Sequence, residues 1–233
     1  MNDIAQIRRD LRSHTDRQKA RHATRFFRTG KGEYGEGDRF LGITVPAIRR
    51  IIKIHPNASI NDAFSLLTSP WHEERLAALC ILVRAYRQAL EKDRKAIVKR
   101  YLSSTQYINN WDLVDVTAPH IVGEYFLHRS HAPLIKLARS SNLWKKRIAI
   151  VSTHRFIREH DLDSTFMISN ILLNDTHDLI HKAVGWMLRE AGKRDINRLR
   201  SFLRQHVHVM PRTMLRYAIE KLSESERRKW LEK

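Results

Sequence analysis

The sequence has little of several residues that define common classes of protein. Its one cysteine, Cys80, excludes an intramolecular disulfide and a cysteine-rich zinc site. Only 8 glycines and 6 prolines in 233 residues leave few of the tight turns that an all-β fold requires. No apolar run approaches the roughly 18 residues of a membrane span. The N-terminal stretch also lacks the apolar core of a signal peptide, so we expect a protein that stays inside the cell.

Acidic residues are scarce relative to basic ones. The chain carries 43 Lys and Arg against 25 Asp and Glu, which gives a formal net charge of +18. Such a surplus predicts a polyanionic partner, and nucleic acid fits it better than a membrane surface. Hydrophobic residues make up 42% of the chain, which is typical of a globular protein with a buried core. We expect a single domain over residues 1–233.

Helical periodicity runs through most of the chain and predicts an all-α fold of about a dozen short-linked helices. Thr44, Ser59 and Ser69 precede expected helix starts, Asp195 begins another helix, and Pro211 begins the last. No hairpin signature interrupts the pattern. The expected breaks between helices fall at residues 30–42, 55–57, 103–108, 161–164 and 174–177.

Several helical segments also resemble one another. EERLAALCILVRA begins at Glu73, KKRIAIVSTHRFI at Lys145 and IHKAVGWMLREA at Ile180. Alignment of these segments places Arg75, Arg147 and Lys182 in register, and a spacing near 36 residues puts the missing member at Trp111. A period of this length with two helices per unit is typical of a curved α-solenoid of HEAT-like repeats. Chance similarity within an all-α protein is the alternative explanation.

The repeat register predicts a basic concave face that contains one acidic residue. Trp111 and Asp115 are four positions apart and would share one side of a helix. The simpler interpretation of Asp115 is a helix-start acid or a salt-bridge partner, and most tryptophans are core residues. The positions expected on this face are Arg75, Trp111, Asp115, Arg147, Lys182 and Trp186.

Two patterns suggest metal or nucleotide sites but lack essential parts. His177 and His181 have metal-ligand spacing, but the segment lacks the glutamate of the H-E-x-x-H motif and a clear third ligand. The glycine-rich stretch 29–38 lacks the G-K-[ST] ending of a phosphate-binding loop. We therefore expect neither a metal nor a cofactor, and interpret the stretch as a mobile loop near the binding face.

Six segments spread over nearly the whole chain carry a family resemblance. They are FLGITVPAIRR from Phe40, WHEERLAAL from Trp71, NNWDLVDV from Asn109, LWKKRIAIV from Leu143, GWMLREAG from Gly185 and PRTMLRYAIEK from Pro211. In these segments the chain resembles the AlkD family of bacterial DNA glycosylases. The resemblance implies a HEAT-like fold and removal of cationic alkylated purines, such as 3-methyladenine and 7-methylguanine, from duplex DNA without a base pocket. It also implies a cytoplasmic enzyme of base excision repair.

The resemblance implies a role for each of five residues. Asp115 would be the catalytic carboxylate, the indoles of Trp111 and Trp186 would pack against the deoxyribose, and Arg147 and Arg189 would hold phosphates. The register adds two further DNA-binding cations, Lys182 and Arg75.

The sequence departs from the family in a longer glycine-rich loop and in Thr44, where we expect glutamine. We expect a monomer. We also expect no strand-cleaving activity, since no lysine for a Schiff base is evident. A non-catalytic module that binds damaged or branched DNA, and a HEAT-type scaffold for an acidic protein, are the alternatives.

Overall fold

The computed structural model describes residues 3–232. All of its regular elements in that range are helices, and none is a strand. The all-α prediction is therefore confirmed. The chain divides into two compact units, Met1–Leu113 and Val114–Lys233, and the boundary falls inside helix α7 (Trp111–Asp115). The assignment of 1–233 to a single domain stays a prediction.

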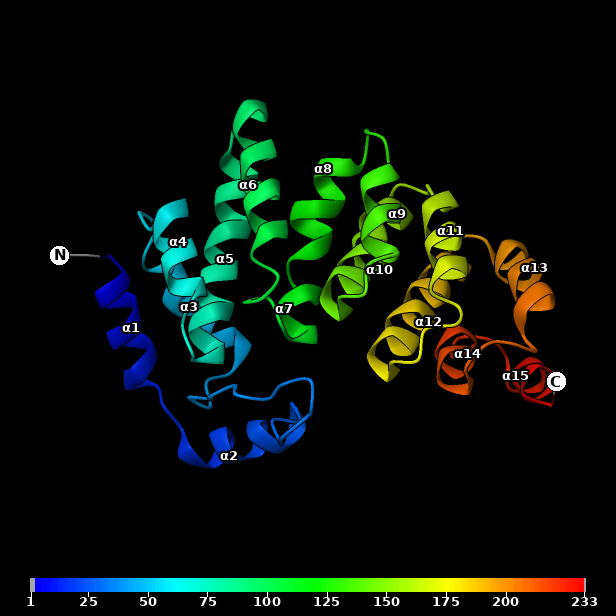
Figure 1. Cartoon of the computed structure of the whole chain (residues 1–233), viewed down its shortest axis with the longest axis horizontal. Coiled ribbons are helices and arrows are strands. Elements are labelled where there is room, and N and C mark those ends of the chain that lie inside the picture. Colours follow the sequence, from blue (N-terminus) through cyan, green and yellow to red (C-terminus); the bar gives the residue numbers. More distant parts are fainter. Residues whose placement is uncertain (1–2, 233) are drawn as a thin grey trace. The chain divides into compact units, whose positions relative to one another are not determined.

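Helix α5 is the centre of the first unit (Figure 1). Helices α3 and α4 pack against it, and α1 packs against all three. Fully buried side chains such as Ile48, Leu67 and Leu79 fill the space between them, which is the main stabilising term for such a bundle. The helices are α1 (Asp3–Ser13), α2 (Arg17–Phe26), α3 (Val45–Lys53), α4 (Ile60–Leu67), α5 (His72–Gln88), α6 (Glu91–Ser103) and the start of α7.

The expected helix starts are confirmed at two of three positions in this unit. Thr44 precedes α3, and Ser59 begins α4 with a capping box to Asp62. The start expected at Ser69 is wrong, since α5 begins at His72. The reason is that residues 70–72 pair with Arg39, whose N–H donates to Pro70 O and whose carbonyl accepts from His72 N. This extended pairing delays the helix.

The expected break at residues 30–42 is confirmed, and both of its ends are anchored. Near its start, Gly35 N donates to Arg28 O at 3.1 Å. At its end, the buried carboxylate of Glu73 accepts from the N–H groups of residues 41, 42 and 43 at 2.9, 2.8 and 3.3 Å. Gly42 has φ 81°, and a Cβ there would lie 2.1 Å from Asp16 O, so only glycine fits this turn against the start of α2.

Two long helices organise the second unit. Helix α10 packs against η1, α9, α11 and α12, and α12 also packs against α13 and α14. Asp195 begins α13 as expected, because its side chain accepts from Arg198 N. Pro211 precedes α14 but not the last helix, since Ser223 caps α15 in the same way. The elements are the π-helix η1 (Pro119–Gly123), α8 (Glu124–Phe126), α9 (Ala132–Ala138), α10 (Leu143–Arg158), α11 (Asp163–Ile171), α12 (Asp178–Gly192), α13 (Ile196–His206), α14 (Arg212–Ala218) and α15 (Glu224–Leu231).

The three similar segments all lie in long helices, α5, α10 and α12. The fourth register position, Trp111, begins a helix of five residues that is followed by a turn and the π-helix. Pro119 explains the interruption, because it has no N–H to donate to the carbonyl four residues earlier. Over the described range, none of the helices combines the length and the apolar character that a bilayer span requires.

Candidate functional site

Asp115 and Arg147 form a forked ion pair in the second unit. Arg147 Nε donates to Asp115 Oδ1 at 2.9 Å, and Nη2 donates to Oδ2 at 2.7 Å. Parallel charge-assisted bonds of this kind fix the plane of the carboxylate as well as its position. The remaining nitrogen, Nη1, donates to Leu179 O at 2.6 Å. Arg147 thus ties the end of α7 to α10 and to the start of α12.

The two partners of this pair differ in exposure. The Arg147 side chain is 5% exposed and the Asp115 side chain 17%. The guanidinium is therefore committed to groups of the protein, whereas part of the carboxylate still faces solvent. A phosphate contact by Arg147 stays a prediction. The simpler interpretation of Asp115 anticipated a salt bridge of this kind.

Trp186 lies half-buried on α12, and its indole packs against His154 of α10. The ring centroids are 5.9 Å apart and the planes meet at 37°. Burial lowers the pKa of His154 and outweighs the opposing charge of Glu190, so the imidazole beside Trp186 is neutral at pH 7. At the preceding position, a Cβ on Gly185 would lie 2.5 Å from Met214 O. The glycine lets α14 approach the helix that carries Trp186.

Two further expected DNA-binding cations lie in the second unit and differ in exposure. Lys182 pairs with Asp178 one helical turn earlier at 2.7 Å, and 39% of its side chain is exposed. The Arg189 side chain is only 17% exposed; it lies 3.2 Å from Glu190 and also pairs with Glu220. The exposed Lys182–Asp178 pair contributes little stability, so phosphate can replace that carboxylate at low cost.

Trp111 belongs to an aromatic cluster in the first unit. Its ring lies 5.5 Å from Phe27 with planes 30° apart, and 5.9 Å from Phe26 in an edge-on contact. Phe26 is 57% exposed despite its size. Sequence reasoning missed both phenylalanines, although the RFF ending of a basic helix was a visible signal.

Arg75 lies inside the first unit and not on a solvent-exposed face. Its side chain is 6% exposed, and Nη2 donates to Asp38 Oδ1 at 2.7 Å. Nη1 donates to Ser69 O at 3.3 Å. The register position therefore holds a structural contact here, and DNA binding by Arg75 stays a prediction that this location does not support.

Sequence reasoning also missed a group of buried polar residues around Arg75. His72 lies between the carboxylates of Asp38 and Asp112, with Nδ1 3.3 Å from the first and Nε2 2.8 Å from the second. Asp112 lies in the first turn of α7, where one of its oxygens accepts from Leu113 N at 2.9 Å and the other binds the histidine.

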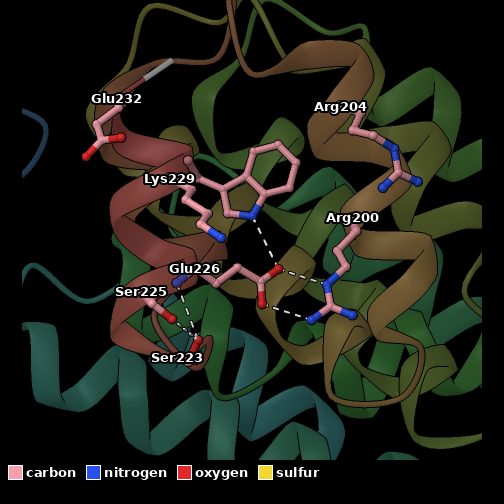
Figure 2. Close-up of a pocket in the computed structure, with 8 residues that line it drawn as sticks. Arg200, Arg204, Ser223, Ser225, Glu226, Lys229 and Glu232 are labelled. Atoms are coloured by element: carbon pink, nitrogen blue, oxygen red, sulfur yellow. Dashed lines mark hydrogen bonds and ion pairs between the residues drawn. The ribbon is translucent and has the colours of Figure 1, made fainter.

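Two cavities are lined by residues other than Asp115 and Arg147. One of about 230 Å³ in the first unit is lined by rings, including Phe27 and Phe40, with His72 in its wall. The other, of about 770 Å³, lies between α13 and α15 (Figure 2). There Arg200 Nε and Nη2 donate to the two oxygens of Glu226, each at 2.8 Å. The Trp230 indole donates to the same carboxylate. These contacts fasten α15 to α13.

Residues 3–232 contain no cluster of three or more His, Cys, Asp or Glu side chains that could hold a metal ion. The two histidines with metal-ligand spacing have other contacts. His177 Nδ1 accepts from Leu179 N at 3.1 Å, and His181 Nε2 bonds to Asp175 O.

Comparison with known proteins gives a family and a fold. The family model described as DNA alkylation repair enzyme matches residues 7–222. A solved structure of a predicted DNA alkylation repair enzyme from Enterococcus faecalis superposes with a TM-score of 0.70 at 15% sequence identity. The superposition covers 91% of this chain and 98% of that chain. No curated protein sequence matches this chain.

Proposed function

The chain belongs to the family of DNA alkylation repair enzymes, and from this premise we propose that it is a monofunctional DNA glycosylase. Its substrates are cationic alkylated purines in duplex DNA, such as 3-methyladenine and 7-methylguanine. It hydrolyses the N-glycosidic bond, and the products are the free base and an abasic site. The net charge of +18 supports a DNA duplex as the binding partner.

The observation that carries this proposal is a carboxylate that is fixed by a buried guanidinium and still partly exposed. Alkylation at N3 or N7 makes the base a cationic leaving group, so the base needs little protonation. The transition state then resembles an oxocarbenium ion, whose positive charge lies on the sugar. Asp115, oriented by Arg147 at 2.9 and 2.7 Å, provides a preorganised negative charge for that cation.

We propose different roles for the expected site residues, according to their burial and contacts. We assign Arg147 to the orientation of Asp115, because its guanidinium is buried and fully bonded. Lys182 is suited to a backbone phosphate, since its side chain and its partner Asp178 are both exposed. A phosphate contact by Arg189 requires release of Glu220, the more exposed of its two carboxylate partners. Trp111 and Trp186 are half-buried, and we propose that each packs an exposed part of its indole against deoxyribose.

The direct test is release of 7-methylguanine and 3-methyladenine from methylated duplex DNA by the wild type and by Asp115→Asn. The preorganised charge should stabilise the transition state by ~3 kcal/mol. Its loss should therefore lower the single-turnover rate about a hundredfold or more. Asp93→Asn, at an exposed position of α6, is the matched control and should excise at the wild-type rate. A thermal melt of each variant separates a loss of chemistry from a loss of fold.

One observation favours a second candidate function. Because Arg147 already gives Asp115 a complete ion-pair partner, the pair can also be purely structural, as in a protein that binds DNA without cutting the glycosidic bond. In that case neither wild type nor Asp115→Asn releases base, while both bind duplex DNA tightly. Equal losses of binding and excision in Asp115→Asn would likewise identify the aspartate as structural.

A further inference from the structure

The buried polar residues around His72 form one connected network in the first unit. His72 contacts Asp112 at 2.8 Å and Asp38 at 3.3 Å. Asp38 also accepts from Arg75 at 2.7 Å and from the amide of Asn110 at 3.2 Å. The members come from the loop before α3, from α5, and from the start of α7, so the network joins three segments that are distant in sequence.

This network reaches Trp111 from both sides along the backbone. Asn110 Oδ1 accepts from Trp111 N at 2.8 Å, and the next residue, Asp112, binds His72. The rings add a third connection. The His72 imidazole lies 4.9 Å from the Phe27 ring, and Phe27 lies 5.5 Å from the indole of Trp111. Three of the groups that hold Trp111, namely Asn110, Asp112 and Phe27, therefore each contact His72 or Asp38.

The charges of the network balance only when His72 is protonated. Asp38 and Asp112 contribute two negative charges, and Arg75 contributes one positive charge. The His72 and Asp38 side chains are each 3% exposed, and an unbalanced charge at that depth is costly. Geometry leads to the same assignment, since both ring nitrogens face carboxylate oxygens and only imidazolium donates from both.

The electrostatics around His72 agree with this assignment. Burial lowers the pKa of His72, but the charge and hydrogen bond of Asp112, with the hydrogen bond of Asp38, outweigh burial and the opposing charge of Arg75 and raise it to about 9. Lys19 and His22 of α2, and Glu73 of α5, are the other charged or titratable groups around the adjoining cavity. Glu73 is occupied by three backbone N–H groups.

We propose that protonated His72 is a positioning residue for Trp111: it holds the start of α7 through Asp112 and, through Phe27, the indole itself. Neutral imidazole has one N–H and releases one of the two carboxylates. The start of α7 then loosens while the rest of the unit stays folded. The consequence for catalysis rests on the proposed function, in which Trp111 packs against deoxyribose, whereas the positioning itself does not.

The first experiment follows side-chain NMR signals of the full-length protein from pH 6 to 10. The proposal expects the His72 imidazole to titrate near pH 9, and the Trp111 indole N–H signal, assigned with Trp111→Phe, to move with the same midpoint. In His72→Gln this movement should disappear. In His55→Gln, which removes a histidine bonded to Asp10 at 2.7 Å in the same unit, it should remain. The proposal is overturned if the His72 imidazole titrates with a midpoint near pH 6.5, or if the Trp111 indole signal does not move as His72 titrates.

The second experiment measures single-turnover excision and duplex affinity separately. His72→Gln should lower the excision rate by about 10- to 100-fold, because small displacements of positioning groups are costly, with a much smaller change in Kd. Asp112→Asn should act through the same contact, so the double variant His72→Gln/Asp112→Asn should be no slower than either single variant. Additive losses, or a wild-type rate in His72→Gln, overturn the proposal.

The two experiments also separate this proposal from the function on which part of it rests. If the wild type releases no base, the glycosylase assignment fails, and the shared NMR midpoint still decides whether His72 positions Trp111. If His72→Gln does not fold, the wild-type titration alone decides, because it requires no variant at position 72.

Discussion

Arg147→Lys tests whether the forked geometry matters or only the positive charge. Lysine keeps the charge but cannot bond both Asp115 oxygens and Leu179 O in one plane. We expect the free energy of unfolding to fall by about 1–3 kcal/mol, since buried hydrogen bonds to charged groups are lost. Excision should fall at least tenfold more than duplex affinity. Arg194→Lys, at an exposed position of the same unit, should change neither the free energy of unfolding nor the excision rate. An equally large effect of this control would show that the two parallel bonds to Asp115 are not the cause.

His72 should also make stability depend on pH in a defined direction. Its pKa rises from 6.5 to about 9 on folding, so the folded state binds the proton more tightly than the unfolded state. The contribution of roughly 3 kcal/mol is complete below pH 6.5 and is lost as the pH rises toward 9. Denaturant unfolding of wild type and His72→Gln across pH 6–10 should therefore give curves that converge at high pH. A constant difference would contradict this linkage.

At this scale the sequence suggests candidate residues but not their partners. The spacing of Trp111, Asp115 and Trp186 is visible because it follows from helical periodicity and a 36-residue register. The fork between Asp115 and Arg147 joins residues 32 positions apart, and the His72–Asp112 contact spans 40. Contacts of this length depend on how helices pack, which no local pattern encodes.

Helices α12 and α14 approach each other closely at a position that a single substitution can test. Gly185→Ala would place a Cβ 2.5 Å from both Met214 O and Tyr217 Cβ. Alanine in a helix interior normally stabilises by up to about 1 kcal/mol relative to glycine. Here overpacking should reverse the sign and cost about 1–3 kcal/mol. Denaturant melts would show this loss, and Gln205→Ala on the exposed side of α13 should remain near neutral.

The end of the irregular segment before α3 depends on one buried acid. Glu73→Gln replaces one acceptor oxygen by an NH₂ group that faces backbone donors at residues 41–43. We expect a loss of about 1–3 kcal/mol and faster proteolysis within residues 28–44. Limited proteolysis with mass spectrometry would locate the cuts. Equal cleavage of both proteins would show that the carboxylate does not anchor the turn.

Element boundaries were predictable where capping chemistry is local. Ser59 and Asp195 bond to N–H groups within their own helices, so sequence alone located α4 and α13. The start expected at Ser69 failed because Arg39, thirty positions earlier, pairs with the backbone there. Similarly, the register placed Trp111 on a helix but did not predict that Pro119 would convert its continuation into a π-helix.

For the molecule as a whole, charge governs encounter with DNA. With +18 formal charges, duplex affinity should fall linearly with salt on a logarithmic scale. Lys182→Ala should lower that slope by about one, since one phosphate contact is lost whatever the sequence. Fluorescence anisotropy between 50 and 200 mM salt measures it. Lys95→Ala, at an exposed position of α6 and outside the expected binding positions, is the control. An equal change in slope in this variant would show that the slope depends on net charge and not on a contact made by Lys182.

The three segments related by the repeat period lie in the long helices α5, α10 and α12. The fold superposes on a solved structure with a TM-score of 0.70 at only 15% identity, so most side chains of this fold can differ. The register placed all of its positions on one exposed face, and this prediction was wrong at Arg75. Arg75 and Lys182 are equivalent in sequence, yet one is buried against Asp38 and the other is exposed.

The irregular segment before α3 also bears on how this protein can change over generations. Its first turn closes on Arg28, and its last three N–H groups are held by Glu73. Residues inserted or deleted within the exposed turn 31–33 need not disturb the flanking helices, because this turn precedes Asp38 and Arg39 and because loop closure becomes only slightly less favourable with length. Chain length can therefore vary within this turn, and laboratory evolution can graft new sequences there while α3, α5 and Trp111 keep their positions.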